Sequence, residues 1–189
     1  MNNAQPVLNY YNLSDDVKAF STTRHGGVSE GNYASLNINE YCGDSKDNTD
    51  ANRLLLANEL GIDANHIIMP HQTHGVESRI IGEEFATLPD GVKKMLLEGV
   101  DAVMTNIPGI CIGVSTADCI PVLLYDEEHH AAAAIHAGWR GTQARIVHKA
   151  VQEMRMAYQT DPAKLKAVIG PGISLDNFEV GDDVYADFE

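Results

Sequence analysis

The sequence predicts a mixed α/β fold built as one domain. Short apolar runs rich in β-branched residues recur along the chain, and two longer stretches between them have helical spacing. The runs are apolar almost throughout, which is typical of strands in a sheet that is covered on both faces. With 189 residues, 44% of them apolar, and no repeat or linker, we expect a single domain over residues 1–189.

The first expected elements are a strand and a helix. Residues 17–23, VKAFSTT, predict a strand that leads into the glycine-rich turn RHGGVSEGNY. A helix is expected to begin at Asp47 or Asn48, either of which could cap it, and to run to about Leu60. Gly61 is suited to end it, because glycine readily adopts the conformation that follows a helix.

The rest of the chain predicts further strands and a second helix. Strands are expected at the apolar runs 66–69, 76–81, 101–105, 110–115, 120–125, 131–136 and 165–170. A helix is expected over 142–158, where apolar residues between Ile146 and Met154 follow helical spacing.

Charge and composition exclude several classes of partner. The formal net charge of −14 disfavours binding to a nucleic-acid backbone or to an anionic membrane. No run approaches the roughly 20 apolar residues of a membrane span, and the N-terminus lacks the pattern of a signal peptide. We therefore expect a cytoplasmic protein that binds small molecules. An anionic substrate would need a local group of arginine, histidine or metal.

The cysteines favour free thiols or a metal thiolate. Cys42, Cys111 and Cys119 are odd in number and form no CxxC pair, so a disulfide framework is not expected.

Side chains that can bind metals recur where strands meet turns. HQTHG supplies His71 and His74, of which only one need be a ligand, STADC supplies Cys119, and AIHAGWRG supplies His136. Two imidazoles and one thiolate suit Zn²⁺, and three protein ligands leave a fourth tetrahedral position open for water. Each of these residues could also be purely structural. A histidine at a strand end is often only a capped polar residue, and Cys119 could be a small buried apolar side chain.

These motifs carry a resemblance to a known family. The chain resembles the YfiH-like family in HQTHG, TADCIPVLLYD, HAGWRG and VIGPGIS, preceded by TTRHGGVSEGNYASLNIN and by Asn52 and Arg53. Members are variously labelled polyphenol oxidoreductase (laccase-type) and purine nucleoside phosphorylase. The resemblance implies a four-layer α/β/β/α sandwich with mixed sheets, and zinc held by His74, Cys119 and His136. It leaves His71 as a residue of the substrate pocket.

The resemblance also implies a reaction. The expected activity is phosphorolysis of purine nucleosides (adenosine, inosine, guanosine and methylthioadenosine) together with deamination of adenosine. Phosphorolysis needs cations near the pocket, for which Arg24 and Arg140 are the candidates, with Asn37 as a weaker polar contact. Deamination needs a carboxylate that moves a proton, and Asp118 is the candidate. The expected partners are thus purine nucleosides and phosphate.

Three alternatives remain open. A copper-dependent polyphenol oxidase (laccase) needs about four copper ions, typically held by HxH pairs, and no HxH occurs here. A cysteine hydrolase could use Cys119 as nucleophile and His136 as base. A non-catalytic interaction module could use the metal structurally, with a fourth protein ligand.

The resemblance implies additional residues after the last motif. Family members usually continue for several tens of residues beyond VIGPGIS, with an arginine-bearing segment near the end. The 1–189 domain is therefore expected to be truncated at its C-terminus, with an incomplete pocket.

Overall fold

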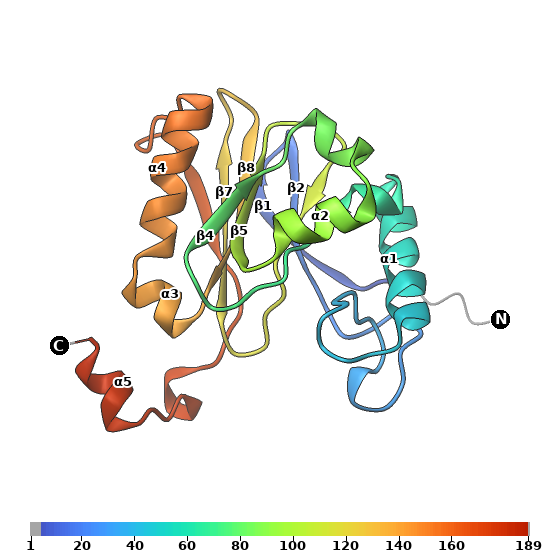
Figure 1. Ribbon diagram of the computed structural model, residues 1–189, viewed down its shortest axis with the longest axis horizontal. Coiled ribbons are helices and arrows are strands. Elements are labelled where there is room, and N and C mark those ends of the chain that lie inside the picture. Colours follow the sequence, from blue (N-terminus) through green and yellow to red (C-terminus); the bar gives the residue numbers. More distant parts are fainter. Residues whose placement is uncertain (1–4, 189) are drawn as a thin grey trace.

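A computed structural model describes residues 5–188 (Figure 1). Its strands are β1 (Leu8–Ser14), β2 (Val17–Thr22), β3 (Ile67–Ile68), β4 (Glu77–Ile80), β5 (Val100–Thr105), β6 (Cys111–Ile112), β7 (Ile120–Asp126), β8 (Ala131–Ala137) and β9 (Lys166–Ile169). Its α-helices are α1 (Lys46–Leu60), α2 (Asp90–Leu97), α3 (Trp139–Gln143), α4 (Ile146–Tyr158) and α5 (Asp182–Ala186). Every helix in this part of the chain is too short or too polar to cross a bilayer.

The centre of the molecule is a mixed sheet in the order β4-β5-β8-β7-β9. β4 and β5 are parallel, whereas β8 is antiparallel to both β5 and β7, and β7 is antiparallel to β9. Two smaller pairs accompany it, the antiparallel hairpin β1-β2 and the parallel pair β3-β6. The predicted mixed α/β class is confirmed.

The two faces of the central sheet have different covers. Alternate residues of β8, such as Ala133 and Ile135, pack with Ile146, Ala150 and Met154 of α4. Residues from the opposite face of the sheet pack against the β3-β6 pair, α2 and the β1-β2 hairpin, and α1 packs on the outer side of β3. Figure 1 shows α3 and α4 on one side of the sheet and α1 and α2 on the other. The four-layer sandwich stays a prediction, because here the second layer consists of two separate strand pairs.

Several expected elements differ in detail. The helix expected over 142–158 is divided into α3 and α4, because Arg145 between them has the left-handed backbone conformation, with φ at 62°. The strand expected over 110–115 shortens to the two residues of β6, since only these pair with β3. The strand β1 and the short helix α2 were not predicted. The stop of α1 at Gly61, with φ at 72°, is confirmed, and Ser45 rather than Asp47 or Asn48 occupies the N-cap position.

Candidate metal centre

Three side chains that could hold a metal ion converge at one end of the central sheet. His74 lies in the loop before β4, Cys119 directly precedes β7, and His136 is the second-last residue of β8. One nitrogen of each imidazole and the Cys119 sulfur all lie within 4.8 Å of one another. Around a tetrahedral zinc, ligand atoms are about 3.5 Å apart, so small side-chain rotations would let all three share one ion. The structure therefore brings the three predicted ligands together.

The strand register explains this convergence. Because β8 is antiparallel to β5 and β7, its end lies beside the beginnings of both neighbours, and Ile120 pairs with Ala137. Side chains alternate along a strand, and Ile135 and Ala137 pack in the core that α4 covers. His136 must then point to the opposite face, where it is 3% exposed.

A buried carboxylate connects the two histidines. Asp101, which has no exposed surface, accepts a hydrogen bond of 2.7 Å from His136 Nδ1. It also accepts the backbone N–H groups of Thr73, His74 and Gly75 at 3.2, 2.9 and 2.8 Å. Burial by itself raises the pKa of Asp101, but the hydrogen bonds from His136, Gly75 and Thr73 outweigh it and lower the pKa below its ordinary value. Backbone N–H groups point at both oxygens of Asp101, which is the pattern expected of a carboxylate.

Two further contacts hold the ligand loops in place. The Gln72 side chain donates to the Ser115 carbonyl and accepts from the Ser115 N–H, both at 2.7 Å. This pair ties the loop of His74 to the loop that ends at Cys119. On the other side, Ile173 donates its N–H to the Asp118 carbonyl at 2.9 Å. A Cβ at Gly172 would lie 2.9 Å from the Asp118 carbonyl oxygen, a backbone atom, so glycine lets the VIGPGIS segment approach this closely.

Gly138 leaves the space in which the ligands meet. A Cβ on this residue would lie 3.0 Å from His74 Cδ2 and 3.2 Å from the Cys119 sulfur. The HAGWRG motif thus contains the candidate ligand His136 and, two residues later, a glycine that leaves room for the other two ligands.

Replacing Gly138 with alanine is expected to weaken zinc binding about 10-fold, because the new methyl group would displace two of the ligands. Gly91→Ala is the matched control, since a Cβ there meets nothing within 4 Å. Competition with a chelating indicator would measure both affinities. Equal zinc affinity in the Gly138→Ala variant and the control would show that the ligands do not need this space.

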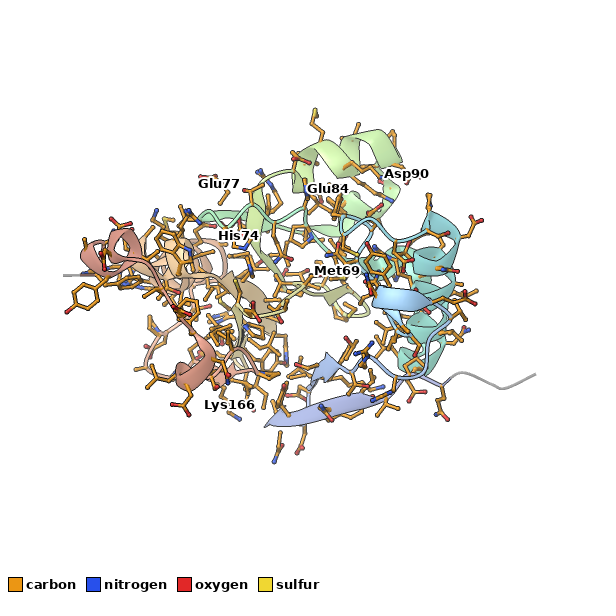
Figure 2. All side chains as sticks on the ribbon, turned by 90° about the horizontal axis from the view of Figure 1, so that it is seen from below. Met69, His74, Glu77, Glu84, Asp90 and Lys166 are labelled. Atoms are coloured by element: carbon orange, nitrogen blue, oxygen red, sulfur yellow. The ribbon has the colours of Figure 1, made fainter. Side chains whose placement is uncertain are left out.

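The candidate ligands line a large cavity. Its volume is about 1600 Å³, and it lies between the central sheet, the β1-β2 hairpin and the loops before β4 and β7. Figure 2 shows His74 and Met69, two of the lining residues, toward the middle of the molecule. The other predicted pocket residues that line it are Arg24, Asn37, His71 and Asp118.

These predicted pocket residues differ in how many of their polar atoms are already hydrogen-bonded within the protein. Arg24 is exposed and uses only Nε, which donates to the Ala34 carbonyl at 2.8 Å. Asp118 is exposed. The Asn37 amide donates to the Asp44 carboxylate at 3.0 Å and to the Cys42 sulfur at 3.2 Å, so it serves its own loop. His71 is held by Glu98 at 2.8 Å, with its ring stacked on Tyr41 at 4.4 Å.

Arg140 does not join this group. Its guanidinium stacks over the ring of Trp139, 4.0 Å from the ring centroid, and it does not line the cavity. Trp139 and Arg140 are the first two residues of α3, and only Gly138 separates this helix from the end of β8. The two candidate cations named from the sequence are therefore in different surroundings.

Without a metal, the Cys119 thiol is a poor nucleophile. Burial raises its pKa, and the neighbouring negative charges of Asp118 and Asp101 raise it further. A cysteine hydrolase needs the opposite shift, because the thiolate is the nucleophile. A divalent cation would supply the positive charge that ionises this thiol.

Asp101, Gln72 and Gly138 were missed in the sequence. Each carried a signal: Asp101 opens the otherwise apolar run DAVMT, Gln72 lies inside HQTHG, and Gly138 lies inside HAGWRG. Their roles depend on which strands are neighbours, and local spacing contains no information on this.

Two relatives with named functions match nearly the whole chain. A purine nucleoside phosphorylase of Bacteroides thetaiotaomicron is 43% identical over 185 residues, which are 97% of this chain and 68% of that protein. Adenosine deaminase RL5, from an unknown prokaryotic organism, is 41% identical over 183 residues, which are 96% of this chain and 69% of that protein.

Solved structures have the same fold. The crystal structure of YfiH from Bacillus licheniformis matches with a TM-score of 0.86 at 28% identity, over 96% of this chain and 68% of that one. YlmD from Geobacillus stearothermophilus matches with a TM-score of 0.81 at 29% identity, over 90% of this chain and 63% of that one.

The fold and the site define a mixed α/β protein in which a His-Cys-His group lines a large cavity. The family model described as multi-copper polyphenol oxidoreductase laccase matches residues 18–189. The chain belongs to this family, which confirms the resemblance found in its motifs.

Proposed function

We propose that this protein is a zinc-dependent purine nucleoside phosphorylase that also deaminates adenosine. The proposed substrates are adenosine, inosine, guanosine and methylthioadenosine, with phosphate as the second substrate. The convergence of His74, Cys119 and His136 on the wall of a cavity that also contains Arg24 and Asp118 carries this proposal. The names of two relatives support it, one a purine nucleoside phosphorylase and the other an adenosine deaminase. A cytoplasmic location is part of the proposal.

The donor set favours one zinc ion over several coppers. Two imidazoles and a thiolate with an open fourth position match catalytic zinc sites. Among residues 5–188, the His74, Cys119 and His136 group is the one cluster of three or more metal-binding side chains that could share an ion. A multicopper oxidase, the function that the family's description names, would need several such clusters.

Four residues that line the cavity have proposed roles in the two reactions. When bound, zinc supplies Lewis-acid polarisation of a water or a substrate atom. Arg24 can bind phosphate through its two terminal nitrogens, since only Nε is used within the protein. Asp118, beside Cys119 and exposed to the cavity, would take a proton from the attacking water and deliver it to the departing amine in deamination. Asn37 and His71 would contact the substrate from the wall of the cavity.

Elemental analysis followed by adenosine turnover tests the proposal. We expect one zinc per chain, adenine that forms only when phosphate is present, and inosine that forms without it. Stoichiometric copper with oxidation of phenols would instead support the laccase alternative. Zinc-loaded protein that forms neither adenine nor inosine would overturn the proposed function.

Replacing Arg24 with alanine is expected to raise the phosphate concentration needed for half-maximal phosphorolysis about 10- to 100-fold. The lost interaction is a hydrogen bond to a charged group, for which about 1.5–3 kcal/mol is usual. Deamination, which needs no phosphate, should change much less. Arg155→Ala is the control, because Arg155 is an exposed arginine of α4 outside the cavity. Unchanged phosphate dependence in Arg24→Ala would assign the phosphate contact to another cation.

A further inference from the structure

We infer that Asp101 is a positioning residue that arranges both histidine ligands before any metal arrives. The inference rests on the proposed metal site, and it concerns a residue that would not itself touch the metal. It follows from the contacts of one buried carboxylate with two segments that are far apart in the sequence.

The first contact selects the tautomer of His136. A carboxylate can only accept hydrogen bonds, so the 2.7 Å contact requires that His136 Nδ1 carries the proton. The other ring nitrogen, Nε2, is then the one with a free lone pair for a metal. His136 is 3% exposed and Asp101 is fully buried, so the contact between them lies away from bulk solvent.

The second set of contacts shapes the loop of His74. Three consecutive N–H groups, those of Thr73, His74 and Gly75, point at the two oxygens of Asp101. His74 has a positive φ of 62°, which is uncommon for a residue with a side chain and persists only where the surroundings enforce it. The three hydrogen bonds from this turn to Asp101 supply that enforcement. The same carboxylate therefore fixes the ring of one ligand and the backbone of the other.

The chain contains a matched control for this role. Asp126 is also a buried aspartate of the central sheet, 4% exposed. It accepts a histidine Nδ1, from His129 at 2.9 Å, and the backbone N–H groups of Glu128 and His129 at 2.9 and 3.2 Å. It does so at the β7-β8 turn, at the opposite end of these strands from the candidate metal centre.

Asp101→Asn keeps the shape of the side chain but places an amide N–H₂ group where N–H donors converge. We expect it to weaken zinc binding 10- to 100-fold, the usual effect of losing a partner that orients a metal ligand. Asp126→Asn should lower the melting temperature without changing zinc affinity. Competition with a chelating indicator gives the zinc dissociation constants, and thermal unfolding gives the stabilities. Equal zinc affinities in the two variants would overturn the inference.

A second measurement does not depend on the variant folding or on zinc binding. In wild-type protein stripped of metal, nitrogen-15 NMR of the His136 ring should show the tautomer with the proton on Nδ1. The tautomer with the proton on Nε2 would overturn the inference even if zinc binds. Conversely, wild-type protein with the expected tautomer but no affinity for zinc would overturn the proposed function and leave the role of Asp101 in ordering the two histidines supported.

Discussion

The Cys119→Ser variant is expected to bind zinc at least about 100-fold more weakly than the wild type, more than the usual cost of losing an orienting partner. The hydroxyl of serine stays protonated at neutral pH, whereas zinc ionises a coordinating thiol, so the substitution removes a charged ligand. With cobalt in place of zinc, the absorption band from thiolate-to-metal charge transfer should disappear as well.

Cys42→Ser is the matched control for this substitution. Cys42 is exposed and lines the same cavity, but its sulfur hydrogen-bonds with Asn37 and Asn39 of its own loop. We expect it to bind zinc as the wild type does. If Cys119→Ser retained wild-type affinity, or if both variants lost affinity to the same extent, Cys119 would not be a ligand.

The Asn52→Ala variant is expected to lose about 3 kcal/mol of unfolding free energy. Asn52 is fully buried in α1, where its amide accepts the N–H of Val28 and donates to the Ser35 and Asn37 carbonyls and the Ser29 hydroxyl. Removing it leaves several buried polar groups without partners, each of which costs about 1–3 kcal/mol. For a domain of this size the melting temperature should fall by about 6–12 °C.

Asn58→Ala serves as the control for Asn52→Ala. Asn58 is an exposed residue of the same helix, so its substitution should change stability by no more than about 0.5 kcal/mol. The loop that Asn52 holds also contains Ala34, whose carbonyl receives the Arg24 side chain. Asn52→Ala should therefore raise the phosphate concentration needed for half-maximal phosphorolysis as well as lower the stability. Equal melting temperatures of the two variants would refute this account of the loop.

Local patterns predicted most strands and a set of candidate ligands, and the resemblance to the family selected His74 over His71 within that set. Apolar runs such as IPVLLY and AAAAIH mark buried strands wherever they pair, and the strands β7 and β8 begin and end within a residue or so of the expected positions. Ligand candidates recurred at strand ends, which is where a sheet presents side chains to one site. Apolar runs and the residues at their ends depend on neighbours in the sequence, so the sequence alone predicts them.

Pairing and direction could not be predicted in the same way. The role of Asp101 depends on β5 lying beside β8, a contact between residues 35 positions apart. Arg140 stays a predicted anion contact, chosen because it lies at a helix start, but the stacking of its guanidinium on Trp139 had no signal in the sequence. The left-handed conformation of Arg145, which divides the expected helix, has no sequence signal because arginine rarely adopts it.

X-ray absorption spectroscopy of the zinc-loaded wild-type protein tests the central claim most directly. Ligation by His74, Cys119 and His136 with an open fourth position predicts one sulfur at about 2.3 Å and three nitrogen or oxygen atoms at about 2.0–2.1 Å from the zinc. A first coordination shell without sulfur, or with two or more sulfur atoms, would contradict it.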